Sequence, residues 1–529
     1  MNTHAELIPI YQAFWENITT QSQEMSFLLS QVFNAWENGH TFAYLDAESL
    51  KIAHNAPPEI IGTNQDSTPL LLIGHRLFLN KVRTMERICA NRIQKLYHHQ
   101  TAFRLPENDY FNEDATEQKQ ATQMALQQGF TLITGGPGTG KTYTVSRILA
   151  LLCKNNETTL PHIALTAPTG KAAANLQDSL RKNLPFRLPE NIAHHLQQLE
   201  GKTLHRLLGI TPPLMRPQYH RNQPLPYDVI IVDEASMIDL SLMTQLLQAT
   251  RDDACLILLG DENQLPAVGT GAILSAVAKQ EKLTARLTKS RRFQAASAIG
   301  HLAKAIIEDD ENQAWDCFHQ YDTLRANEHQ DFYHEWYQTQ QSYWQAVDSG
   351  SLKDVFEHFY DGMVLCALRY DVERFNRQYL SLLREKREIA HEWFAGRAVM
   401  MTQNQPSMEL SNGDIGIILP NREGRLMAYF KSGTQAIDIA RLTAYEDAFA
   451  MTVHKSQGSE YRQIRLIAPQ SPQHELFDRA LLYTAITRVK ESEDASLLFQ
   501  FYGSEESFKN AIHHLSNKRT GIEDFLKEI

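Results

Sequence analysis

The sequence predicts an α/β protein with two sheet-containing domains, and two observations lead to this fold class. The chain has 529 residues, which corresponds to about three or four domains of ordinary size. Short apolar runs alternate with amphipathic helical patterns in two separate sets, as expected of buried parallel strands joined by helices. Each set predicts one sheet, and the remaining sequence predicts smaller parts beside them.

The first 110 residues alternate amphipathic helical patterns with short turns, for example at Ile8, Tyr11, Phe14 and Trp15. A strand is expected at residues 70–74, followed by a helix with basic residues on its polar sides. We therefore expect a small, mostly helical domain over residues 1–110.

The first sheet domain is expected over residues 111–360 and the second over residues 361–529. The apolar runs of the first set cover residues 130–134, 162–166, 229–233 and 255–259, and those of the second cover 364–368 and 448–453. Residues 393–445 are rich in turns and short strands, which predicts a small β-barrel inserted into the second domain.

The net charge of −11 argues against a simple basic coat protein for nucleic acid. Residues 308–361 carry 13 acidic residues against Arg325 and Lys353, so this one stretch holds a charge equal to that of the whole chain. The stretch is rich in aromatic residues, which disfavours disorder. We expect packed helices with a solvated acidic face that lies away from any nucleic acid, with a partner-binding surface as the alternative.

Composition and sequence also restrict the compartment. No run of about 18 apolar residues is present, and the first residues lack the pattern of a signal peptide. The five cysteines are odd in number and far apart, which favours reduced core thiols over disulfides or a metal site. We expect a cytoplasmic protein without membrane contact.

A glycine-rich segment lies between an apolar run and a helical pattern, and its residues are Gly135, Gly136, Pro137, Gly138, Thr139, Gly140, Lys141 and Thr142. This is the P-loop pattern, in which backbone N–H groups cradle phosphates. Lys141 is expected to reach the β- and γ-phosphates of ATP, and Thr142 to ligate Mg²⁺. A glycine turn that binds nothing is the alternative, and the strand, helix and Lys-Thr pair disfavour it.

Polar residues also end the third and fourth runs. Asp233 is expected to hold Mg²⁺ and Glu234 to orient and deprotonate the attacking water. Gln264 is expected to sense the γ-phosphate. Taken singly, the acidic pair could be a helix cap and the segment around Gln264 a plain turn.

The ordered set of motifs resembles superfamily one DNA helicases, and within them the RecD family, the alpha subunits of bacterial exodeoxyribonuclease V (RecBCD). The resemblance covers about 370 residues, and the RecD family is indicated by residues 69–79 and 412–416. It implies two RecA-like P-loop motor domains, a small helical amino-terminal domain that docks a partner, and an SH3-like barrel insertion.

The resemblance also implies roles for further residues. Gln118 would bind adenine, Gly458 and Glu460 would approach the ATP sugar and phosphates, and Arg488 would be the arginine finger. Either Arg292 or its neighbour Arg291 would contact ATP, with Arg292 preferred. The residues implied to touch DNA are Pro168, Thr169, Lys171, His205, Thr452, His454 and Lys455.

By resemblance, the chain is an ATP-dependent helicase that moves 5′ to 3′ on single-stranded DNA, loads at duplex ends and serves double-strand break repair by homologous recombination. It would be the motor subunit of a helicase–nuclease with RecB-like and RecC-like subunits, because no segment resembles a nuclease module. The alternatives are a stand-alone RecD-like helicase and an inactive structural subunit. The intact Lys141, Asp233, Glu234, Gln264 and Arg488 argue against inactivity.

Overall fold

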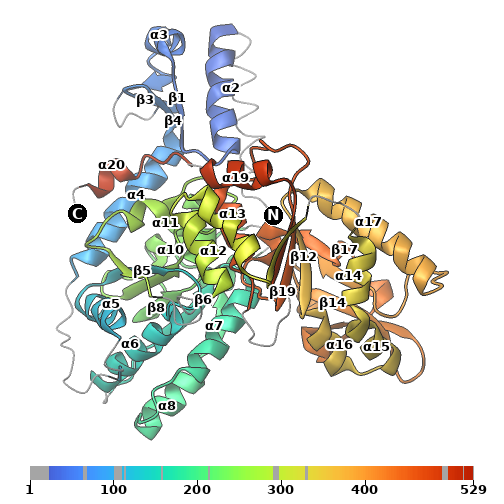
Figure 1. Cartoon of the computed structure of the whole chain (residues 1–529). Coiled ribbons are helices and arrows are strands. Elements are labelled where there is room, and N and C mark those ends of the chain that lie inside the picture. Colours follow the sequence, from blue (N-terminus) through green and yellow to red (C-terminus); the bar gives the residue numbers. More distant parts are fainter. Residues whose placement is uncertain are drawn as a thin grey trace. The chain divides into compact units, whose positions relative to one another are not determined.

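The computed structural model describes residues 23–63, 68–99, 110–111, 115–155, 159–211, 215–289, 297–327, 332–490, 498–515 and 518–527 (Figure 1). The chain divides into two compact units. The first unit contains Met1–Glu262, Pro266–Arg291 and Asn517–Ile529, and the second contains Asn263–Leu265 and Arg292–Ser516. Among the described residues, no helix combines the length and apolar character needed to cross a bilayer.

The amino-terminal part of the first unit is a mixed α/β structure. Its elements are α2 (Gln23–Glu37), β1 (Phe42–Tyr44), α3 (Ala47–Asn55), β2 (Ile61–Gly62), β3 (Leu70–Ile73), β4 (Arg76–Leu79) and α4 (Asn80–Tyr97). The strands form one sheet in the order β1-β4-β3-β2. The expected strand at 70–74 is confirmed by β3, but the expectation of a mostly helical domain missed its partner β4. The two strands form a tight hairpin in which Gly74 has φ +59°, a conformation that glycine adopts at little cost.

The parallel sheet of the first unit confirms all four apolar runs of the first set. Its strands are β5 (Phe130–Gly135), β6 (Ile163–Ala167), β7 (Gly201–Thr203), β8 (Val229–Val232), β9 (Cys255–Gly260) and β10 (Thr284–Leu287), in the order β10-β5-β9-β8-β6-β7. The helices beside it are α5 (Thr116–Gln127), α6 (Lys141–Asn155), α7 (Gly170–Lys182), α8 (Glu190–Gln197), α9 (Leu204–Leu208), α10 (Leu240–Ala249) and α11 (Ile273–Ala278). Each strand from β5 to β9 is parallel to its neighbours, so the carboxyl ends of these strands share one edge.

The second unit also contains a parallel sheet. Its strands are β11 (Leu324–Asn327), β12 (Gly362–Cys366), β18 (Ala450–Thr452), β19 (Gln463–Ile467) and β20 (Phe499–Tyr502), in the order β11-β20-β19-β12-β18. Strands β12 and β18 confirm the two runs of the second set. The helices beside it are α12 (Ala298–Ile307), α13 (Glu311–Gln320), α14 (Tyr333–Thr339), α15 (Gln341–Ser349), α16 (Leu352–Phe359), α17 (Arg369–Lys386), α18 (Arg479–Ile486) and α19 (Glu505–His513).

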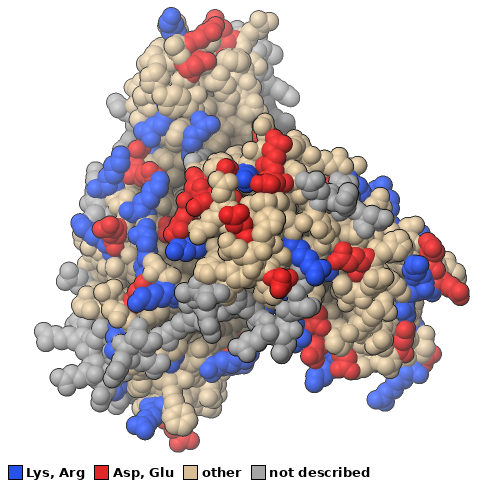
Figure 2. Space-filling view, viewed as in Figure 1, with Lys and Arg blue, Asp and Glu red and all other residues tan. Residues whose placement is uncertain are grey.

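The acidic, aromatic stretch packs on this second sheet, although we expected it in the first motor domain. The ring of Trp315 lies 5.5 Å from that of Phe508, and the ring of Phe318 lies 5.3 Å from the same ring. Acidic residues pair with bases of the same unit, as Asp309 does with Arg479 and His513, and acidic and basic side chains lie together over the region of α12, α13 and α19 (Figure 2). The aromatic residues therefore form core and the acids a solvated face, as expected.

The final segment also departs from the expected boundaries, because residues 518–527 pack in the first unit. They include α20 (Glu523–Leu526). Arg83 of α4 donates to the Gly521 carbonyl oxygen at 2.7 Å, and the Gly521 N–H donates to the buried carboxylate of Glu86 at 2.7 Å. This network attaches the segment to α4.

A second sheet in the second unit occupies the region predicted to be a barrel. Its strands are β13 (Ala398–Met401), β14 (Ile415–Pro420), β15 (Leu426–Phe430), β16 (Gln435–Asp438) and β17 (Tyr445–Asp447). They are antiparallel, in the open order β16-β15-β14-β13-β17, and enclose their own apolar cluster around Phe430 and Val399. The inserted antiparallel sheet is therefore observed, whereas its closure into a barrel stays a prediction.

Candidate functional site

The P-loop follows β5 and leads directly into α6. Gly138 and Gly140 have φ values of +75° and +91°, which lets the loop curl tightly. A Cβ atom at Gly135 would lie 2.4 Å from the Leu287 carbonyl oxygen, so only glycine fits there. The ammonium of Lys141 donates to the carbonyl oxygens of Gly135 at 2.5 Å and Gly136 at 3.1 Å. The cationic group therefore lies inside the loop that the sequence assigns to phosphates.

Gln118 of α5 is attached to this loop. Its side chain is buried, and its Nε2 donates to the Thr139 carbonyl oxygen at 3.1 Å. Next to it, Glu117 accepts from the backbone N–H groups of Thr288 at 2.8 Å and Lys289 at 3.2 Å. Burial of Glu117 opposes its ionisation, but the hydrogen bonds from Thr288 and Lys289 prevail and lower its pKa. Arg291 and Arg292 lie outside the described residues.

Asp233 and Glu234 follow β8, on the same sheet edge as the P-loop. Asp233 is partly buried and accepts from the Glu234 N–H at 2.8 Å. Burial and the negative charge of Glu234 raise the pKa of Asp233, and the positive charge of Lys141 opposes them. Glu234 has φ +51°, a strained value for a residue with a side chain and one that is often found at functional sites. The structure therefore brings Lys141 and the acidic pair together.

The segment with Gln264 is held by residues of the second unit. The Leu265 N–H donates to the hydroxyl of Thr484 in α18 at 2.8 Å. The Gln457 side chain donates to the Leu265 carbonyl oxygen at 3.3 Å, and Gln264 itself is buried. Sequence reasoning missed Thr484 and Gln457 as anchors, because nothing in a linear motif shows which side chain binds a distant backbone group.

The residues assigned to DNA in the first unit follow β6 and β7. Ala167 at the end of β6 pairs with Thr203 at the end of β7, so Thr169 and His205 follow neighbouring strands at one edge. The hydroxyl of Thr169 accepts from the Ala172 N–H at 3.2 Å and caps α7. Pro168 and Lys171 are partly exposed beside it, and His205 is exposed.

This carboxyl edge of the first sheet is divided between two sets of residues. The P-loop and the acidic pair follow β5 and β8, and the residues assigned to DNA follow β6 and β7. Because β8 pairs with β6, the two sets are neighbours on one sheet.

The motif residues of the second unit lie around η5 (Val453–Ser456), which follows β18. Thr452 is buried, and its hydroxyl accepts from the Lys455 N–H at 3.4 Å. The Lys455 ammonium forms an ion pair with Glu446 at 2.5 Å. His454, which precedes Lys455 in the sequence, is partly exposed. Sequence reasoning missed the ion pair with Glu446, although both residues lie in the predicted second domain.

The remaining motif residues of the second unit follow η5 or α18. Gly458 has φ +73° and Glu460 is exposed. Arg488 follows α18, is 4% exposed, and its Nε donates to the Thr484 carbonyl oxygen at 3.2 Å. Thr484 therefore contacts both Arg488 and the segment with Gln264.

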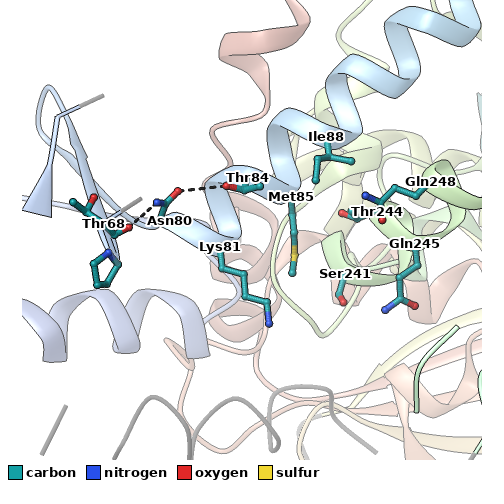
Figure 3. A pocket seen from close by; sticks show the side chains of 11 residues that line it. Thr68, Asn80, Lys81, Thr84, Met85, Ile88, Ser241, Thr244, Gln245 and Gln248 are labelled. Atoms are coloured by element: carbon teal, nitrogen blue, oxygen red, sulfur yellow. Dashed lines mark hydrogen bonds between the residues drawn. The ribbon is translucent and has the colours of Figure 1, made fainter. Parts of the chain in front are cut away.

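The first unit also contains a cavity of about 550 Å³ between α4 and α10 (Figure 3). Asn80 donates to the Thr68 carbonyl oxygen at 2.6 Å on one side of it, and Met85, Gln245 and Gln248 line the other parts. None of the residues that the sequence assigns to ATP or DNA lines this cavity, so the candidate site lies elsewhere, at the sheet edge.

Comparison with known proteins gives matches to both units. Residues 118–270 match the model of an AAA domain, and residues 447–492 match that of a UvrD-like helicase C-terminal domain. The chain is 34% identical over 479 residues to "RecBCD enzyme subunit RecD" of Mycolicibacterium smegmatis, covering 87% of this chain and 83% of that protein. It is 31% identical to the protein of the same name from Haemophilus influenzae, covering 78% and 72%. A solved structure of Pif1 helicases at forked double-stranded DNA matches with 18% identity and a TM-score of 0.42, covering 77% of this chain and 94% of that one.

Proposed function

The chain belongs to the family of RecBCD enzyme subunit RecD, and from this premise we propose how its residues act. It is an ATP-dependent DNA helicase, the motor subunit of a RecBCD-type enzyme. We assign ATP hydrolysis to the P-loop and the acidic pair, and strand binding to the residues after β6, β7 and β18.

The observation that carries this assignment is the shared edge of the first sheet. Lys141 and Asp233 lie within electrostatic reach of each other. Asp233 follows β8, which pairs with β6, the strand that precedes Thr169, and β6 in turn pairs with β7, which precedes His205. A single sheet edge thus places a phosphate-binding loop beside polar groups that fit a nucleic-acid backbone. A change in the phosphate contacts of the P-loop can therefore be transmitted through the first sheet to the residues proposed to bind DNA.

The residues fit ATP and Mg²⁺ on structural grounds. The loop is curled by left-handed glycines, Lys141 points its ammonium at the loop carbonyls, and a carboxylate with a raised pKa faces that cation. Thr142 and Asp233 would hold Mg²⁺, which would neutralise phosphate charge when bound. Glu234 would orient the attacking water and take its proton, Gln264 would sense the γ-phosphate, and Gln118 would read adenine.

Two further cations are assigned to the transition state. Arg488, with Arg292, would stabilise the charge that develops on the transferred phosphoryl group. Gly458 and Glu460 would approach the sugar and phosphates. In the structure the Nε of Arg488 donates to the Thr484 carbonyl oxygen, which leaves the other N–H groups of the guanidinium for this role.

We assign DNA binding to Pro168, Thr169, Lys171, His205, Thr452, His454 and Lys455. From family membership we also propose that the chain moves from 5′ to 3′, loads at duplex ends and assembles with RecB-like and RecC-like subunits. It would be located in the cytoplasm and act in double-strand break repair by homologous recombination. The amino-terminal part of the first unit is the proposed partner-docking region, and the inserted antiparallel sheet is proposed to be SH3-like.

Hydrolysis is tested with Lys141→Gln. Single-strand-stimulated ATP hydrolysis should be lost, because the loop then carries no cation for the phosphates. Lys154→Gln, which removes a charge from the other end of α6, should keep the wild-type rate. Equal rates in all three proteins would contradict the motor function.

Polarity and assembly need separate experiments. The chain should unwind duplexes with 5′ tails and not those with 3′ tails, and the reverse result would overturn the proposed direction. Purified from its native cell, it should bring two larger subunits with it. Recovery of the chain alone, together with unwinding by the chain alone, would favour a stand-alone helicase.

A further inference from the structure

A cavity of about 510 Å³ lies at the carboxyl edge of the parallel sheet in the second unit. Its walls come from the start of α14, the first turns of α17, and the segments that follow β19 and β20. The lining includes Asp371, Arg374, Phe375, Gln470 and Tyr502. This volume suits a ligand of the size of one nucleobase, because small-molecule sites usually measure about 300–1,000 Å³.

The topology of the sheet marks this place as a ligand site. The chain leaves β12 through α17 and the inserted sheet and returns as β18 on one side of β12. It leaves β19 through α18 and returns as β20 on the opposite side of β19. Because β12 and β19 are neighbours, their outgoing connections diverge and open a crevice between their carboxyl ends. In open parallel sheets ligands bind at such switch points.

The polar group of the cavity is a buried carboxylate with spare bonding capacity. Asp371 is 3% exposed, and its Oδ1 lies 3.2 Å from the guanidinium of Arg374. Its Oδ2 has no hydrogen-bond donor among the described residues. Burial raises the pKa of Asp371, although Arg374 opposes the effect. An unsatisfied carboxylate oxygen inside a protein is costly, so a ligand that offers N–H donors would be stabilised there.

Aromatic rings form the apolar part of the cavity. The rings of Phe332 and Phe375 are stacked 5.5 Å apart, and those of Phe332 and Tyr502 lie 4.4 Å apart. These three rings are buried against one another, so they form a packed apolar wall beside the polar groups of the cavity.

We propose that this cavity binds one unstacked guanine base, with Asp371 accepting from its N–H groups and Arg374 donating to its acceptor atoms. Guanine offers two adjacent donors, the ring N–H and the exocyclic amine, together with the O6 and N7 acceptors that arginine prefers. Thymine has a single N–H between two carbonyl groups and cannot match a carboxylate in this way.

The DNA strand is the source of the base that the structure favours. Thr452, at the end of β18, pairs with Cys366, at the end of β12, so the proposed DNA contacts of the second unit share the sheet edge with the cavity. This step rests on the proposed DNA binding. A free guanine nucleoside has the same chemistry and is the other source to be tested.

The test measures binding of the full chain to two labelled 20-mers by fluorescence anisotropy, oligo-dT and the same strand with two central guanines. Wild-type protein should bind the guanine-containing strand about tenfold more tightly, as expected for one good bidentate contact. Asp371→Asn should bind both strands alike. Glu373→Gln, an exposed acid in the same turn of α17, should keep the wild-type preference.

A second variant protects the test against a folding defect. Gln470 is exposed at the rim of the cavity, so Gln470→Trp should fill the space without disturbing the core. It should also remove the preference for guanine while leaving the affinity for oligo-dT unchanged.

The outcomes separate this proposal from the proposed function. Failure of wild-type protein to bind either strand would contradict DNA binding itself. Equal binding of the two strands, with no binding of guanosine that depends on Asp371, would overturn the guanine site alone. Binding of guanosine that depends on Asp371, without discrimination between the strands, would identify the free nucleoside as the ligand.

Discussion

Replacement of Thr484 by valine tests whether the segment with Gln264 is positioned by α18. The Thr484 hydroxyl is completely buried and accepts from the Leu265 N–H at 2.8 Å. Valine keeps the shape of the side chain but leaves this backbone donor without its acceptor. A buried unsatisfied donor costs about 1–3 kcal/mol. If the bond holds Gln264 in its catalytic position, the rate should fall by about 5- to 150-fold, since each 1.36 kcal/mol is tenfold.

The assay is single-strand-stimulated ATP hydrolysis, with kcat and KM for ATP determined separately. We expect kcat to fall and KM to change little, because Gln264 is proposed to act on the γ-phosphate during the reaction. Thr487→Val is the matched control: Thr487 is also buried at the end of α18, but its hydroxyl donates to the Thr484 carbonyl oxygen at 3.1 Å. An equal loss of kcat in both variants, or a lower melting temperature with unchanged kcat, would refute the positioning role.

Three further predictions concern charged groups. Asp233→Asn should raise the melting temperature of the nucleotide-free chain at pH 8 but not at pH 4. Burial and the charge of Glu234 raise the pKa of Asp233 in the folded chain to about 7 from 3.8. The wild-type chain therefore loses stability as the pH rises from about 4 to about 7, and the variant does not. Glu446→Gln should release Lys455 from its ion pair and tighten single-strand binding by up to about fivefold at low salt, with no gain at high salt. Glu86→Ala should lower the free energy of unfolding in urea by about 1–3 kcal/mol, because it removes the buried carboxylate that accepts from the Gly521 N–H, while Arg83 keeps Asp524 as a partner. A change below about 1 kcal/mol would show that the network is dispensable.

The sheets could be predicted because parallel strands that are buried on both faces read as continuous apolar runs. Runs such as residues 229–233 therefore appear directly in the sequence. The short strands β1 and β4 were not predicted, since strands of three or four residues give too few positions to show an alternation of apolar and polar residues. The turn at Gly74 was the available signal for β4.

The assignment of the acidic, aromatic stretch failed for a different reason. Its composition indicates that the aromatic residues are buried, but not against which sheet. Besides its neighbour Phe318, Trp315 contacts Phe501 and Phe508, almost two hundred residues further along the chain. Contacts at that separation leave no local pattern.

The candidate site shows the same limit at the level of single bonds. Motif spacing predicted Lys141, Asp233 and Glu234 because the P-loop and the strand ends have local signatures. The bond from Leu265 to Thr484 and the ion pair of Lys455 with Glu446 depend on which elements meet in three dimensions. A local sequence pattern therefore predicts which chemical groups are present, but it does not predict which distant residues hold them in place.

In the first unit, the segment proposed to act in hydrolysis is bonded to the strand that precedes the residues proposed to bind DNA. The backbone N–H of Asp233 donates to the carbonyl oxygen of Thr166 at 2.9 Å, and Thr166 is three residues before Thr169, which caps α7. Lys141 acts electrostatically on Asp233. A change in the charge of bound phosphates would alter the forces on Lys141 and Asp233. Asp233 follows β8, which pairs with β6, the strand that precedes the residues proposed to bind DNA. Because β6 and β8 pair from Ile163 with Val229 to Thr166 with Val232, we expect a displacement at Asp233 to reach the proposed DNA residues through this part of the sheet.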